Sequence, residues 1–183
     1  VFVGGACRNT FNIKGIGNDG GIGYFENGQS IIGINRGVML STGPIENSEG
    51  PNDSRRISGD FKDLTGDPDL KQLSQLNIQD AVGIEFDFVP LDSVVTFRYV
   101  FASEEYCEFV GSNFNDVFGF FLSGPGINGT FSNQAINVAL VPGSQDYVSI
   151  NTINHNVNQN YFVHNELKED ADRCGIPWTN SPN

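Results

Sequence analysis

The sequence SEEYCEFVGSNFNDVFGFFLSG, residues 103–124, decides how the rest of the chain is interpreted. It begins with two adjacent acids, Glu104 and Glu105, continues through an asparagine-rich turn, and ends in an apolar run at residues 117–122. Because this run has apolar residues at consecutive positions, it predicts a central strand that is covered on both faces. The oxygen-bearing side chains that precede it are typical of a loop that a bound cation holds in place.

Two segments upstream of this stretch, residues 81–89 and 94–101, alternate between apolar and polar side chains. A period of two predicts half-buried strands. The short connection between them, residues 90–93, contains a proline and predicts that the two strands form a β-hairpin.

The apolar faces of this predicted hairpin also specify its register. With a two-residue loop, Phe86 would lie opposite Phe97, and Glu85 would lie opposite Arg98. A slip of one residue would place Phe97 opposite an acid, so the sequence favours this register over its neighbours.

The remaining elements are predicted to be short and separated by turns. Gly is abundant, with 22 residues, and Gly and Asn accept the positive φ angles that tight turns need. Further strands are expected at residues 1–3, 10–13, 38–40, 135–141 and 147–153, and short helices at residues 69–76 and 167–174. Regularly spaced strands with turns between them indicate an all-β fold, and we predict a β-sandwich of jelly-roll type with long loops.

The chain length of 183 residues fits one such domain. We expect the sandwich to span residues 1–165, with residues 166–183 forming an extension that packs on it or leads to a next domain. The chain begins without a signal peptide and ends on polar sequence, so we expect targeting and anchoring segments to lie elsewhere.

One glycine motif invites a different interpretation. Gly15, Gly17 and Gly20 are spaced as G-x-G-x-x-G, which in dinucleotide-binding proteins follows a strand and opens a helix. The residues that follow here lack helical periodicity, so we predict a flexible glycine turn.

The charge of the chain limits its partners. It has 22 Asp and Glu against 10 Lys and Arg, for a formal net charge of −12. Nucleic acid is not an expected partner, because phosphate binding needs clustered cations. No apolar run approaches the roughly 20 residues of a spanning helix, so direct membrane insertion is not expected. The acidity suits either a well-solvated surface or the recruitment of divalent cations.

Calcium is the cofactor that the acidic residues favour. Carboxylates, Asn side chains and backbone carbonyls are its usual ligands, and Glu104, Glu105, Asn115 and Asp116 supply them around one turn. The alternative is that these side chains cap turns or accept backbone hydrogen bonds.

A second acidic segment is the next candidate for calcium. Residues 60–69 contain four aspartates, of which Asp67 and Asp69 are the candidate ligands. Their spacing does not follow the EF-hand pattern, and the alternative is a solvated acidic loop that leads into a short helix.

The three cysteines, Cys7, Cys107 and Cys174, are widely spaced and form no C-x-x-C pair. A zinc knuckle or a thioredoxin-like site is therefore not expected. An odd number allows one disulfide and one thiol, or three unpaired thiols, and the sequence leaves the connectivity open. A bridge from Cys107 to either terminal cysteine would fit an oxidising compartment.

Catalytic patterns are weak throughout the sequence. On a strand, Glu104 and Glu105 would point to opposite faces and would not flank one glycosidic bond, although either can pair with a distant acid. His155 and His164, the only histidines, lie in an asparagine-rich segment without a nucleophile signature nearby. We therefore expect a protein that is not an enzyme, and keep a hydrolase as an alternative.

The order and spacing of several segments resemble the choice-of-anchor L domain family. The stretch SEEYCEFVGSNFNDVFGFFLSGPGI at residues 103–127 is the most specific. It is accompanied by GVMLSTG at 37–43, FDFVPLDSVVTFRYVFA at 86–102 and INVALVPGSQDYVSIN at 136–151. The resemblance covers about residues 3–165. Cys107 stands where the family more often has Pro or Asn.

The resemblance implies a secreted or cell-surface bacterial module of the kind found in large adhesin-like proteins, and it implies no catalytic role. We therefore expect an extracellular adhesion or recognition module that calcium stabilises. Its expected partners are a glycan or protein at a cell surface and the neighbouring domains of its own chain. A carbohydrate-binding module, a purely structural domain of a surface fibre and a hydrolase are the alternatives.

Overall fold

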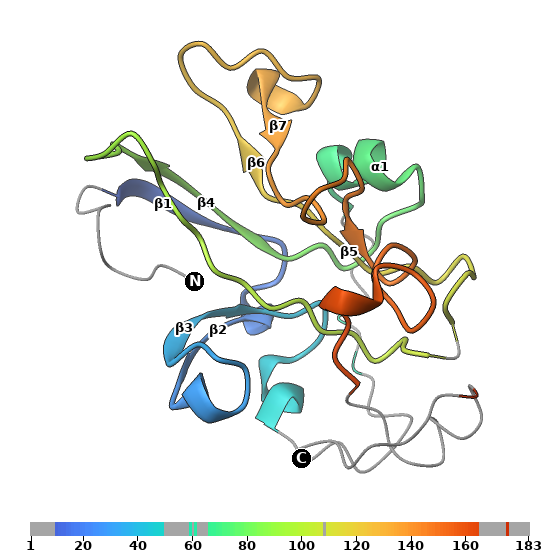
Figure 1. Cartoon of the computed structure of the whole chain (residues 1–183). Helices are drawn as coiled ribbons and strands as arrows, with labels where there is room; N and C mark the ends of the chain where they lie inside the picture. The colour runs from blue at the N-terminus through green and yellow to red at the C-terminus, as the bar shows by residue number, and fades with distance from the viewer. Residues whose placement is uncertain are drawn as a thin grey trace. The chain divides into compact units, whose positions relative to one another are not determined.

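The computed structural model describes residues 10–49, 59, 61, 66–107, 109–164 and 175 (Figure 1). The chain divides into two compact units, and each is built from two separate pieces of sequence. The first unit comprises Val1–Gly66 and Ile78–Val100, and the second comprises Asp67–Asn77 and Phe101–Asn183.

Strands predominate among the described residues, which confirms the predicted all-β class. These residues form eight strands, one α-helix and several short 3-10 helices. The strands pair into four antiparallel sheets of two strands each. The jelly-roll sandwich stays a prediction, because these small sheets do not by themselves define its strand order.

In the first unit, β1 (Thr10–Ile16) pairs with β4 (Gly83–Phe88). These strands confirm the elements predicted at residues 10–13 and 81–89. The pairing shifts between Phe11 and Lys14, where Asn12 has a φ of 53°. Past this bulge, Lys14 Nζ lies 3.7 Å from Glu85 Oε1, and the two exposed side chains form an ion pair.

The glycine-rich segment after β1 forms a turn, as predicted, and the flexibility of this turn stays a prediction. A 3-10 helix at Asp19–Gly21 leads directly into β2 (Ile22–Glu26), which pairs with β3 (Arg36–Leu40). Gly17 has a φ of 79°, and a Cβ there would lie 1.9 Å from the carbonyl oxygen of Ala81. Gly17 of the G-x-G-x-x-G motif thus permits a close backbone approach just after β1 and just before β4.

The predicted hairpin between residues 81–89 and 94–101 is wrong. Residues 94–100 are not in a strand, and β4 pairs with β1 instead. Arg98 does not meet Glu85, because its Nη2 donates to the carbonyl oxygen of Gly33 at 2.8 Å.

The side-chain alternation of this segment is nevertheless largely kept. Val95 and Phe97 are half-buried between exposed neighbours, and the ring of Phe97 meets that of Phe88 edge-on with centroids 6.1 Å apart. Tyr99 departs from the pattern and is exposed. The period of two therefore identified two inward-facing side chains, Val95 and Phe97. It did not show that the backbone of this segment would fail to form a strand.

In the second unit, the predicted central strand at residues 117–122 is split in two. β5 (Val117–Phe118) pairs with β8 (Val148–Ser149), and β6 (Phe121–Leu122) pairs with β7 (Ile136–Asn137). The strands predicted at residues 135–141 and 147–153 are thus present, but they are shorter than expected.

A side chain explains the split. Asn137 Oδ1 accepts hydrogen bonds from the backbone N–H groups of Phe120, at 3.0 Å, and Ala139, at 3.1 Å. These bonds satisfy backbone donors that a continuous ladder would otherwise pair. Two short strands therefore replace one long strand, and the side chain of Asn137, in β7, bonds to the backbone of Phe120 in the break between them.

The single α-helix, α1 (Pro68–Ser74), confirms the helix predicted at residues 69–76. Asp67 begins it as the N-cap, with Oδ1 accepting from the backbone N–H groups of Asp69 and Leu70 at 3.0 and 2.8 Å. Proline at the first helical position suits this start, because its missing N–H would have no partner within the helix.

Two side chains of α1 form hydrogen bonds with other residues of the second unit. Asp69 Oδ1 accepts from both the backbone N–H and the hydroxyl of Ser132, each at 2.9 Å. Gln72 Nε2 donates to the carbonyl oxygen of Thr130 at 3.0 Å. Helix α1 is therefore tied to the turn between β6 and β7.

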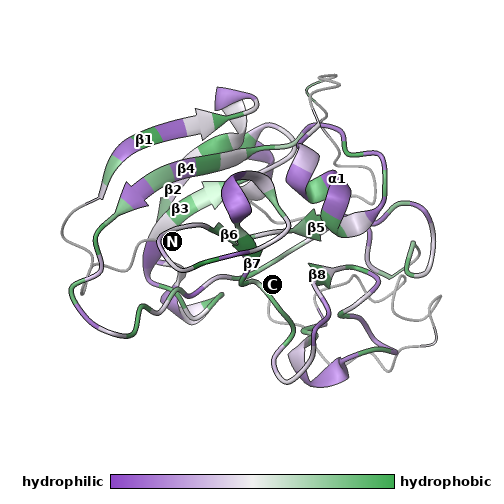
Figure 2. Ribbon diagram, turned by 90° about the horizontal axis from the view of Figure 1, so that it is seen from above, coloured by the Kyte–Doolittle hydropathy of each residue, from purple (hydrophilic) through white to green (hydrophobic). Residues whose placement is uncertain are grey.

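Several of the most deeply buried residues of the second unit lie in and after β8. Val148, Ser149, Ile150 and Asn154 are at most 2% exposed. Figure 2 shows β5 and β8 coloured as hydrophobic, whereas the short helices carry hydrophilic residues.

The remaining 3-10 helices span Gly28–Ser30, Ile45–Glu49, Ser132–Gln134 and Gln159–Tyr161. The elements predicted at residues 1–3 and 167–174 lie outside the described residues.

Candidate functional site

Residues 103–116 form a loop that is closed at its base by a side-chain hydrogen bond. The hydroxyl of Ser103 donates to Asp116 Oδ2 at 2.6 Å and accepts from the backbone N–H of Glu105 at 3.0 Å. The same hydroxyl therefore joins the two ends of the loop and orients the turn that begins at Glu105.

A second loop, residues 149–158, holds the far side of the first. Asn151 Oδ1 accepts from the backbone N–H of Gly111 at 2.6 Å, and Asn151 Nδ2 donates to the carbonyl oxygen of Ser112 at 3.2 Å. The backbone N–H of Asn151 in turn donates to Asn115 Oδ1 at 3.0 Å. One asparagine thus fixes three points of the loop 103–116.

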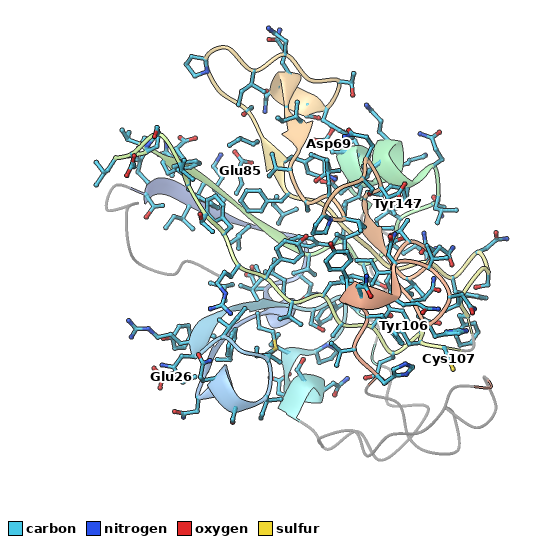
Figure 3. All side chains as sticks on the ribbon, in the orientation of Figure 1. Glu26, Asp69, Glu85, Tyr106, Cys107 and Tyr147 are labelled. Carbon is cyan, nitrogen blue, oxygen red and sulfur yellow. The ribbon has the colours of Figure 1, made fainter. Side chains whose placement is uncertain are left out.

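Tyr106 anchors the middle of the loop to the same neighbour. Its hydroxyl donates to the carbonyl oxygen of Ile153 at 2.7 Å, and its ring lies 4.9 Å from that of Phe162, centroid to centroid. Figure 3 labels Tyr106 beside Cys107 in this part of the second unit. Tyr106 is half-buried, so it supports the loop and does not present its ring freely to a partner.

Asn154 organises the second loop from within and is fully buried. Its Oδ1 accepts from the backbone N–H groups of Asn156 and Val157, each at 2.9 Å, and its Nδ2 donates to the carbonyl oxygen of Ile150 at 2.8 Å. Sequence reasoning missed this residue. The signal available was the repeated asparagine in residues 151–160, since asparagine side chains readily bond to nearby backbone.

Two aromatic rings lie at the exposed end of the loop 103–116. Phe114 is 64% exposed and Phe109 is 38% exposed. Their ring centroids are 5.3 Å apart and their planes meet at 67°, an edge-to-face arrangement. Sequence reasoning missed Phe114, although an aromatic residue between two asparagines in a turn was a usable signal.

The four calcium candidates of this loop are placed near one another along the chain but differ in exposure. Glu104 and Asp116 are exposed, whereas Glu105 and Asn115 are half-buried. Asp116 and Asn115 each have one side-chain oxygen engaged in the hydrogen bonds given above.

Asp67 and Asp69, the second group of candidates, are used at the start of α1, as its N-cap and as the acceptor for Ser132. In the part of the chain that the structure describes, no three His, Cys, Asp or Glu side chains form a group suited to a metal ion. The assignment of calcium stays a prediction for both groups.

Cys107 is 4% exposed, and its place in a disulfide stays a prediction. Cys7 and Cys174, the two cysteines available as its partner, lie outside the described residues. Which of them pairs with Cys107 therefore stays a prediction.

Comparison with known proteins identifies the family. The model described as the choice-of-anchor L domain matches residues 1–175, which is nearly the whole chain. No curated protein and no solved structure matches it. The chain belongs to the choice-of-anchor L domain family, whose members are associated with the cell surface. Among the described residues, no helix has the length and apolar character needed to cross a bilayer.

Proposed function

We propose that this chain is a non-enzymatic adhesion or recognition module of a large bacterial surface protein, with a jelly-roll sandwich as its complete architecture. One observation carries the proposal: the loop 103–116 is hydrogen-bonded along its length and still exposes the ring of Phe114. A loop that is ordered before binding loses less conformational entropy when a partner docks on it. Membership in a cell-surface family agrees with this role.

Calcium is the proposed stabiliser of the loop. Glu104 is exposed, and Asp116 has a second carboxylate oxygen beyond the one that accepts from Ser103. A hard cation coordinated by carboxylates, by Asn115 and by backbone carbonyls would offset the mutual repulsion of these acids. Calcium binding is supported by the oxygen-bearing side chains of Glu104, Asn115 and Asp116 and by their closeness along the loop.

Thermal unfolding in excess calcium and in EGTA tests this proposal. Calcium at a hundredfold excess over its Kd should stabilise the wild type by about 2.7 kcal/mol, because it binds the native state alone. Glu104→Gln and Asp116→Asn keep an acceptor oxygen but lose the charge, and each should remove most of the difference. An unchanged difference in both variants would transfer the site to Asp67 and Asp69, and no shift in the wild type would refute calcium binding.

Three alternatives compete with the recognition module. A carbohydrate-binding module is favoured by the exposed ring pair of Phe109 and Phe114, since aromatic rings stack on sugars. A structural domain of a surface fibre would need no exposed binding loop. A hydrolase would depend on paired carboxylates such as Glu104 and Asp116.

Arrays of glycans and of extracellular matrix proteins, probed with the purified chain, separate these functions. The recognition module should bind at least one array element, and Asn151→Ala, which loosens the loop 103–116, should weaken that binding. Absence of binding to both arrays would favour the structural domain. Hydrolysis of a bound glycan that Glu104→Gln or Asp116→Asn abolishes would overturn the non-enzymatic proposal.

A further inference from the structure

The exposed ring pair is a rigid feature of the second unit. The hydroxyl of Ser112 accepts from the backbone N–H of Phe114 at 3.0 Å, and Asn151 bonds to the backbone of Gly111 and Ser112. The turn between Phe109 and Phe114 is thus ordered by a hydrogen bond within the turn, from Phe114 to Ser112, and by the hydrogen bonds that Asn151 of the neighbouring loop makes to it. The exposure of Phe114 is imposed by ordered backbone, and its ring packs edge to face on the partly exposed ring of Phe109, so the two rings form a small apolar surface.

The loop that carries this ring pair is acidic. Residues 103–116 contain four carboxylates and no lysine or arginine. Glu104 and Asp116 are exposed within this loop. A surface of this kind repels anions and attracts cations, and its charge raises the association rate of a cationic partner.

We propose that Phe109 and Phe114 form the contact surface of this module and that its partner is a protein segment rich in arginine or lysine. The inference rests on the proposed recognition function and names its partner class. A guanidinium or ammonium group can lie over the exposed face of Phe114 in a cation–π contact, while the nearby carboxylates neutralise the partner's other charges.

Calorimetric titration with two peptides tests the proposal. The probe is a twelve-residue peptide of alternating arginine and leucine, and its counterpart has glutamate in place of arginine. Both are titrated in calcium and in EGTA, each at low and at high salt, because calcium is the proposed stabiliser of the loop and also competes for its carboxylates. The arginine peptide should bind the wild type with an affinity that falls as salt rises, and the glutamate peptide should not bind.

Variants of one ring separate a cation–π contact from general attraction. Phe114→Ala should weaken binding of the arginine peptide by about five- to tenfold, which corresponds to the loss of an exposed cation–π contact and its apolar area. Phe114→Tyr keeps an aromatic face and should retain the affinity, whereas Phe114→Leu keeps only apolar character and should lose part of it. Phe11→Ala, which removes a ring that is 46% exposed on β1 in the first unit, is the matched control and should change nothing.

Unchanged affinity in Phe114→Ala would overturn the assignment of this surface. If the wild type did not bind the arginine peptide but bound a neutral glycan on the array, the proposed recognition function would be supported and the proposed cationic partner would be refuted. If neither the peptide nor any array element bound, both proposals would fall.

Discussion

Asn154→Ala should lower the free energy of unfolding by about 3 kcal/mol, because each buried backbone group that loses its partner costs about 1–3 kcal/mol. The substitution deprives the backbone N–H groups of Asn156 and Val157 and the carbonyl oxygen of Ile150 of their partner. For a chain of this size, the loss corresponds to a decrease of roughly 6–12 °C in Tm. Thermal or urea unfolding followed by circular dichroism measures it.

Two variants show whether the hydrogen bonds themselves carry this effect. Asn154→Asp can still accept from the two N–H groups but cannot donate to Ile150, and it buries a charge, so it should also destabilise. Asn156→Ala removes an exposed side chain from the same turn and should change the stability by less than about 0.5 kcal/mol. A loss in Asn154→Ala no larger than that in Asn156→Ala would contradict the role assigned to the buried amide.

The second large effect is expected at Cys107. Loss of a native disulfide typically costs about 2–5 kcal/mol, since the bridge restricts the unfolded chain over a long loop. Either partner, Cys7 or Cys174, would close a long loop, so Cys107→Ser should destabilise the chain by an amount in this range. A reducing agent should have the same effect on the wild type.

The terminal cysteines supply the matched controls for this prediction. The variant that removes the true partner should be as unstable as Cys107→Ser, and the variant that removes the remaining cysteine should behave like the wild type. Peptide mapping without reduction then identifies the bonded pair. If Cys7→Ser and Cys174→Ser were both neutral, the effect of Cys107→Ser would have to come from its 4% exposed side chain and not from a bridge.

Local signals predicted local structure well. The alternation in residues 81–89 identified β4, and the helix predicted at residues 69–76 corresponds to α1. Its N-cap Asp67 followed by Pro68 is also a local signal, but it was not used to place the start of the helix. The pairing of β4 with β1 could not be predicted in this way. It joins residues more than 65 positions apart, as Ile16 and Gly83 show, and a nearer partner with matching periodicity was available in residues 94–101.

In the candidate site, too, local sequence predicted local features but not the contacts between distant segments. The sequence indicated that residues 103–116 form an oxygen-rich loop and that its acids are candidates for a cation. It did not indicate that Asn151 and Asn137 would bond to backbone groups in distant segments. Such bonds depend on which loops meet in the fold and leave no periodic pattern in the sequence. In a turn-rich sequence with many asparagines, nothing distinguishes the asparagines that make these bonds from the others.

The exchange of segments between the two units has a consequence for fragments of this chain. The second unit takes Asp67–Asn77 from between the two pieces of the first unit. A fragment that starts at residue 101 would therefore lack α1, and Ser132 and Thr130 would lose the side chains of Asp69 and Gln72. Neither unit can be obtained by one cut, because each is made of two separate pieces of sequence.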